Sequence, residues 1–149
     1  MNTQNSDSNT ISGIQQQSTM TIKRIIENEI LVRRDDSVSE KLFIPDAVIV
    51  TVHGVRLVGE AELRRFIQQS NESPLVNVRI KNEVTHISFL RPEVAIISAI
   101  QFIYLLEGDT LKEAGKGAMT FVMIEDGGRW LIAAAQNTLI QKLPFEWKG

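Results

Sequence analysis

Two histidines and a single tyrosine are the side chains of this sequence best suited to acid–base chemistry or to polarising a bound molecule. Histidine titrates near neutral pH and suits a general acid or base, but Gly54 beside His53 favours a hairpin tip in solvent. His86 could join it from a neighbouring strand. Two histidines without an assured carboxylate partner make a poor metal site, so we expect no metal and no cofactor. Tyr104 could donate to a ligand carbonyl or simply fill a strand end, so the catalytic residues stay unknown.

Neutral polar side chains within apolar segments are the second group of candidates. Gln101 interrupts an almost wholly apolar run, and its amide needs either a pocket contact or a cross-strand hydrogen bond. Gln136 and Asn137 are adjacent, so in a strand they face opposite sides and one of them should see a cavity. Alternation groups Gln136 with Trp130 and Ile132. Met119 shares a face with apolar neighbours and is expected in a core, an interface or a pocket wall.

Composition narrows the class of protein to which these residues belong. The chain has 149 residues, 43% of them hydrophobic, which suits one domain that buries roughly 70% of its unfolded surface. A net charge of −2 argues against a nucleic-acid partner, and no apolar run reaches the ~18 residues of a membrane span. The chain has no cysteine, which fits a cytoplasmic location. The polar segment 1–19 is expected to be a disordered tail.

The first half of the sequence predicts helices around one hairpin. Isoleucines at spacings of three and four predict a helix over 21–33, and a capping box predicts a second, shorter helix over 37–43. The β-branched segment 46–58, broken at Gly54, predicts a hairpin whose first strand carries Ile49, Thr51 and His53 on one face. Helical periodicity then resumes over 59–69.

The second half predicts four strands. Alternation begins at Val76 and places His86 on the face of Val78 and Ile80, provided that no bulge intervenes. The apolar run 94–106 predicts a central strand covered on both faces, followed by strands over 110–125 and 130–138. Residues 141–149 read as a short tail.

This order of elements resembles the nuclear transport factor 2-like superfamily over residues 21–139. The local marks are LFIPDA at 42–47, Gly54 and Gly59, PEVA at 92–95, and GRWLIA at 128–133. The following AAQNT at 134–138 is similar to the SnoaL-like and SgcJ/EcaC-like branches. The resemblance implies an α+β domain over 20–140, in which a cone-shaped, curved, mainly antiparallel sheet is wrapped by three N-terminal helices.

The resemblance also implies a pocket on one face of that sheet. Ketosteroid isomerase-like members carry a general-base aspartate where this sequence has Thr51, and a hydroxyl cannot replace that carboxylate. We therefore expect a binding domain for a small hydrophobic molecule rather than a recognisable enzyme. The expected ligand-binding residues are Ile49, Thr51, His53, His86, Gln101, Tyr104, Met119, Gln136 and Asn137.

Two alternatives remain open. A SnoaL-like or isomerase-type enzyme could use His53 or His86 as base and Tyr104 or Asn137 to polarise its substrate. Alternatively, the chain could be an association module. An apolar outer face on the strand 94–106 has no helix left to cover it, so we expect a homodimer formed through the sheet.

Overall fold

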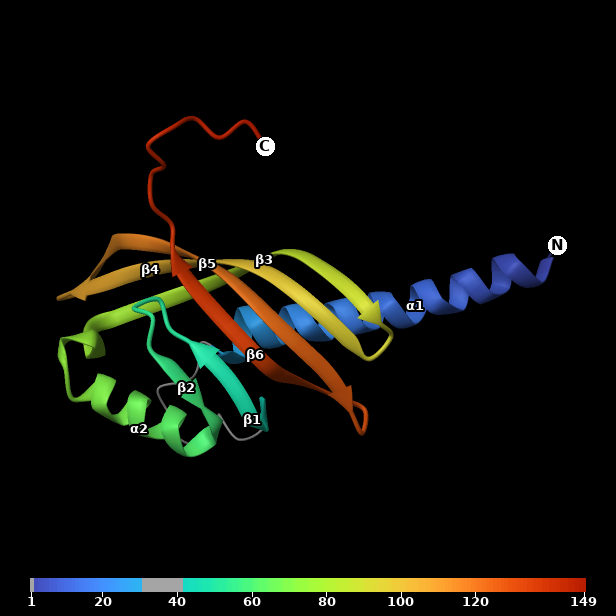
Figure 1. The fold of residues 1–149 in the computed structure, drawn as a ribbon, viewed down its shortest axis with the longest axis horizontal. Helices are drawn as coiled ribbons and strands as arrows, with labels where there is room; N and C mark the ends of the chain where they lie inside the picture. Colours follow the sequence, from blue (N-terminus) through green and yellow to red (C-terminus); the bar gives the residue numbers. More distant parts are fainter. Residues whose placement is uncertain (1, 31–41) are drawn as a thin grey trace.

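A long helix on one side of a curved sheet opens the structure (Figure 1). The computed structural model describes residues 2–30 and 42–149. Helix α1 (Asn2–Arg24) continues directly into one stretch of π-helix, η1 (Ile25–Glu29). Its isoleucines Ile22, Ile25 and Ile26 are buried against the sheet, as the predicted helical stripe requires.

Six strands form one open, mixed sheet in the order β2-β1-β6-β5-β4-β3. Only the β1–β6 pair is parallel, and every other pair is antiparallel. The strands are β1 (Phe43–Val50), β2 (Arg56–Val58), β3 (Val78–Arg91), β4 (Val94–Glu107), β5 (Thr110–Asp126) and β6 (Arg129–Leu139). Helix α2 (Gly59–Asn71) and a 3₁₀ turn, η4 (Pro74–Asn77), connect β2 to β3.

The core lies between α1, η1 and the inner face of the sheet. Along β4 the odd-numbered residues Ala95, Ile97 and Ala99 are buried, whereas their even-numbered neighbours are half-buried. Phe121 and Met123 on β5 continue the buried layer. Alternation with period two therefore assigns one face of the sheet to the core and leaves the other uncovered by any described element.

The predicted α+β architecture is confirmed, and most boundaries are close to those expected. Two elements differ, and one predicted element lies almost wholly outside the described residues. The first helix begins at Asn2 instead of near residue 21, because the polar segment before Ile22 contains no proline and continues the helical turn set by the isoleucine stripe. The predicted helix over 37–43 lies almost wholly outside the described residues, and β1 already begins at Phe43. The hairpin is shorter than expected, since 51–55 is a turn.

Two bulges overturn the predicted face assignments. In β3 the register shifts between Val84 and His86, so His86 pairs with Ser98 on the outer face. In the β5–β6 pair the register shifts at Val122 and Met123. Because one extra residue reverses every later side chain, Gln136 turns outward while Asn137 turns inward. The expectation that Gln136 shares a face with Trp130 and Ile132 is therefore wrong.

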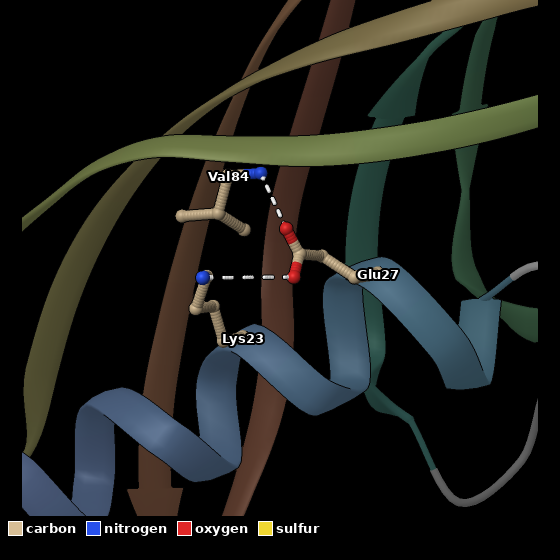
Figure 2. Close-up of polar contacts among 3 residues, drawn as sticks. All are labelled: Lys23, Glu27 and Val84. Atoms are coloured by element: carbon tan, nitrogen blue, oxygen red, sulfur yellow. Dashed lines mark hydrogen bonds and ion pairs between the residues drawn. The ribbon is translucent and has the colours of Figure 1, made fainter.

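The bulge in β3 is also where the helix meets the edge of the sheet. The backbone N–H of Val84 donates to Oε2 of Glu27 at 3.0 Å, and Lys23 Nζ lies 3.9 Å from the other carboxylate oxygen (Figure 2). β3 is an edge strand, and the Val84 N–H points to Glu27 on the side of β3 that has no neighbouring strand. The carboxylate of Glu27 satisfies a half-buried donor that would otherwise lack a partner.

Replacing Glu27 should therefore destabilise the fold mainly because the backbone N–H of Val84 loses its acceptor. The loss of the ion pair with Lys23 should matter less. We expect Glu27→Ala to lower the free energy of unfolding by about 1 kcal/mol, and Glu27→Gln by less, because the amide oxygen still accepts. Urea denaturation measures both values. Glu29→Ala is the matched control, since its pairing with Arg24 is exposed and should contribute less than about 0.5 kcal/mol. Equal losses for Ala and Gln would contradict this account.

Candidate functional site

A cavity of about 310 Å³ opens between the inner face of the sheet, α2 and the end of η1. Helix α2 turns its apolar stripe toward this space, and the strands supply the opposite wall. Cavities of this size accommodate a small organic molecule. The apolar walls are formed mainly by Ile49, Leu57, Leu63, Phe66, Ile67, Val78, Ile80 and Met119.

Three amide side chains from three strands form a continuous row, and two of them, Gln101 and Asn137, line the cavity. Asn137 Nδ2 donates to Gln101 Oε1 at 2.9 Å, and Gln101 Nε2 donates to Asn82 Oδ1 at 3.1 Å. Asn82 Nδ2 then donates to the carbonyl oxygen of Ile26 in the π-helix at 3.1 Å. Gln101 Nε2 also lies 3.4 Å from the sulfur of Met119. All three amides are buried, so the row is one connected polar network within an apolar layer.

A glycine makes this row possible. Asn137 lies on β6 and Gln101 on β4, so their contact must cross the intervening strand β5. Gly117 of β5 pairs directly with Gln101. A Cβ atom at position 117 would lie only 2.1 Å from Asn137 Oδ1, so any larger residue would displace this amide. Because Gly117 has no side chain, the amides of Asn137 and Gln101 have room to form their hydrogen bond above β5.

The row has a direction, and it ends at Asn137. Every amide donates its N–H toward the helix, which leaves the carbonyl oxygen of Asn137 as the terminal acceptor. This oxygen is buried and has no hydrogen-bond partner among the described residues. A buried acceptor left unpaired costs on the order of 1–3 kcal/mol. Asn137 thus presents an unused acceptor on a residue that lines the cavity.

The turn at 51–55 forms the rim. Thr51 does not project a free hydroxyl into the cavity, because its Oγ1 accepts from the Val55 N–H at 3.1 Å. Backbone bonds from Thr51 N–H to the Val55 carbonyl and from Gly54 N–H to the Thr51 carbonyl close the turn. His53 is exposed at its tip, as the hairpin interpretation favoured. The turn is held by its own hydrogen bonds, and Gln101 and Asn137 supply the amide groups of the lining.

The lining of this cavity contains no Asp, Glu, Lys or Arg side chain. Within the described part of the chain, no group of three or more His, Asp or Glu residues is close enough to hold a metal ion. Proton abstraction from carbon needs a base within reach of the substrate, and His53 at the rim is the one titratable side chain of the lining. The arrangement is suited to holding a neutral molecule.

The structure brings six of the nine predicted ligand-binding residues to this cavity. Ile49, Thr51, His53, Gln101, Met119 and Asn137 line it. His86, Tyr104 and Gln136 do not, because the outer face of the sheet carries all three. His86 and Gln136 face outward because of the bulges in β3 and β6. Tyr104 faces outward because the even-numbered residues of β4 lie on the outer face of the sheet.

Sequence reasoning missed two contributions to the site. Helix α2 provides Leu63, Phe66 and Ile67, whereas the helical periodicity over 59–69 predicted only a helix there and no ligand-binding residue. Asn82 was overlooked, although it holds an even-numbered position where β3 otherwise places Val78, Ile80 and Val84 inward. A polar residue in register with apolar ones was the available signal that an amide is buried there.

Solved structures share this architecture. A domain of unknown function with a cystatin-like fold from Nostoc punctiforme is similar at a TM-score of 0.69, with 18% identity over 85% of this chain and 78% of that one. An NTF2-like protein from Novosphingobium aromaticivorans is similar at 0.62, with 14% identity over 89% and 92%. A candidate scytalone dehydratase from the same organism is similar at 0.71, with 10% identity over 92% and 93%.

The chain therefore has the nuclear transport factor 2-like, cystatin-like fold, as its sequence predicted. No family model matches the sequence, and no curated protein matches it. Among the described helices, none combines the length and apolar character needed to cross a membrane. At these identities the likeness defines the fold and leaves the function to be argued from the cavity.

Proposed function

We propose that this domain binds a neutral, mostly apolar small molecule in the cavity between α2 and the sheet. The observation that carries the proposal is the composition of the lining: apolar walls, an amide floor and no Asp, Glu, Lys or Arg side chain. Burying a charged ligand without a compensating charge is strongly unfavourable. An uncharged molecule loses little on entering and gains from the burial of its apolar surface.

The amide row specifies the polar group that such a ligand should carry. Since the oxygen of Asn137 is the unpaired end of the row, the matching group on the ligand is a hydrogen-bond donor. The terminal torsion of an asparagine is soft, so the amide can turn to meet a donor that enters from the cavity. An alcohol or a phenol on an apolar skeleton fits this site best.

An enzymatic role is less well supported. The ketosteroid isomerase-like route needs a carboxylate on the first strand, and Thr51 instead uses its hydroxyl within the 51–55 turn. His86 and Tyr104 face away from the cavity, so of the base and polariser pairs considered for an enzyme only His53 with Asn137 lies in the lining. Binding of a small molecule, unlike catalysis, requires only the apolar walls and the amide groups that the lining contains.

A matched pair of probes tests the proposal. We expect 2-naphthol to bind more tightly than 2-methoxynaphthalene by about fivefold, which corresponds to one hydrogen bond of about 1 kcal/mol. Isothermal titration calorimetry measures both affinities. Asn137→Leu should retain the binding of both probes but abolish the preference for the hydroxyl group.

Gln136→Leu is the control, because it removes the neighbouring amide from the opposite face and should leave the preference intact. Binding of neither probe to the wild-type protein would count against the cavity as a ligand site. Equal binding of the two probes would keep the cavity but reject the role assigned to Asn137.

A further inference from the structure

The π-helical turn η1 changes which backbone groups are bonded at the end of the first helix. The N–H of Ile30 donates to the carbonyl of Ile25, whereas in an α-helix it would donate to the carbonyl of Ile26. The Ile26 carbonyl instead accepts from Asn82 Nδ2 of β3 at 3.1 Å, and both residues are buried. Turns of π-helix inside α-helices are frequent at functional sites. This turn connects the backbone of the helix to the amide row.

The bond to Ile26 fixes the orientation of the Asn82 amide. A backbone carbonyl only accepts hydrogen bonds, and an asparagine amide has one end that donates and one that accepts. Asn82 must therefore turn its NH₂ group to Ile26, which leaves its Oδ1 facing Gln101. With the amide reversed, two oxygens would face each other inside an apolar layer, and neither would have a hydrogen bond. One backbone group thus decides how the first amide of the row is turned.

This orientation passes along the row to the cavity. Gln101 must donate to Asn82 Oδ1, which it does through Nε2, and the sulfur of Met119 beside Nε2 is a weak acceptor that favours the same orientation. The Oε1 of Gln101 therefore faces Asn137, which donates to it through Nδ2. Asn137 Oδ1 is left as the unpaired end. An acceptor stands at the cavity end because an acceptor stands at the helix end.

We propose that the Ile26 carbonyl, acting through Asn82 and Gln101, makes the cavity select ligands that donate a hydrogen bond and reject ligands that only accept one. This inference rests on the proposed binding function and adds the rule that separates related ligands. A ketone in place of a hydroxyl would bring its oxygen against Asn137 Oδ1, and a site built for a donor discriminates against an analogue that lacks it. Asn82 does not line the cavity, so it acts as a positioning residue.

Turning an amide does not relieve this mismatch. A small rotation of Asn137 preserves its bond to Gln101, but a full reversal would place two oxygens against each other at that link. Reversing Gln101 as well moves the same conflict to Asn82, and reversing all three amides moves it to the Ile26 carbonyl. A ligand that only accepts therefore leaves one unfavourable contact in the row, whichever way the amides are turned. An isolated asparagine would have no such preference.

Two probes with the same aromatic skeleton test the rule. Isothermal titration calorimetry should show that the wild-type protein binds 2-naphthol at least about fivefold more tightly than 2-acetonaphthone, whose ketone only accepts. Asn82→Leu disconnects the row from Ile26, so Asn137 becomes free to reverse, and the ratio of the two affinities should fall at least about threefold. Gln101→Met cuts the row at the next link and should have the same effect, which keeps the test available if Asn82→Leu does not fold.

The ratio of affinities distinguishes direction from stability. Poorer packing would weaken both probes alike, and their difference in size is the same in every variant. Gln136→Leu, on the outer face, is the control and should keep the wild-type ratio. Equal binding of the probes to the wild-type protein, or a ratio unchanged by both row variants, would overturn the inference and leave the binding function standing. Binding of neither probe would reject the binding function, and the rule with it.

The direction of the row can also be measured without a ligand. In isotopically labelled protein, NMR scalar couplings across hydrogen bonds should connect Asn137 Nδ2 to Gln101 Cδ, and Gln101 Nε2 to Asn82 Cγ. A coupling from Gln101 Nε2 to Asn137 Cγ would show the reverse direction and would overturn the inference whatever the probes do. In Asn82→Leu, couplings of both directions should appear between Gln101 and Asn137, because nothing then fixes the row.

Discussion

Gly117→Ala is expected to lower the free energy of unfolding by about 3 kcal/mol, a large effect for the addition of one methyl group. The new Cβ would lie 2.1 Å from Asn137 Oδ1 and within 3.0 Å of the other amide atoms. Asn137 must move, and its hydrogen bond to Gln101 is then lost. Chemical denaturation, followed by circular dichroism, measures the change.

A double-mutant cycle separates this clash from the general cost of alanine in a strand. In an Asn137→Ala background no amide occupies the space above Gly117, so adding Gly117→Ala should cost less than about 1 kcal/mol. The interaction energy between the two positions should therefore be large. Additive losses would show that Gly117 acts through the backbone and not by leaving room for Asn137.

Asn82→Leu is expected to have a similarly large effect, again about 3 kcal/mol. Asn82 is 2% exposed and joins two parts of the fold, because it donates to the Ile26 carbonyl and accepts from Gln101. Leucine is of similar size, so packing is conserved while both hydrogen bonds disappear. The buried Gln101 amide then loses its partner on β3. Thermal and urea unfolding should both report the loss.

Asn77→Leu is the matched control for this substitution. Asn77 is exposed in η4, immediately before β3, and its replacement should change stability by less than about 0.5 kcal/mol. Asn82→Leu should also weaken the binding of 2-naphthol, since Gln101 and Asn137 are positioned through the same row. An unchanged affinity would show that Asn137 is held independently of Asn82.

The strands and α2 could be predicted because their residues repeat with a clear period. Val78 and Ile80 continue the alternation that begins at Val76, and the apolar run from Val94 lies between the turn residues Pro92 and Gly108. The start of α1 could not be predicted in this way. Its polar residues have no periodicity, and their helical state depends on the isoleucines that follow.

Residues of the candidate site could be predicted only where a polar residue interrupts an apolar segment. Gln101 was conspicuous in an apolar run, and either Gln136 or Asn137 had to face inward. The choice between them depended on a bulge, which adds one residue without disturbing local composition. The role of Gly117 could not be predicted for another reason. It depends on the register of three strands, and the sequence alone does not determine which residues lie opposite one another.

The contact between Glu27 and Val84 has a consequence for solubility as well as for stability. An open sheet offers two edges to foreign strands, and here β2 contributes three residues whereas β3 contributes fourteen. A long free edge can template the addition of another chain and so start aggregation. The carboxylate of Glu27 occupies an edge N–H in the middle of β3, and the bulge beside it breaks the regular spacing that an incoming strand needs. The helix thereby covers part of the longer free edge, which is the edge more open to pairing with another chain.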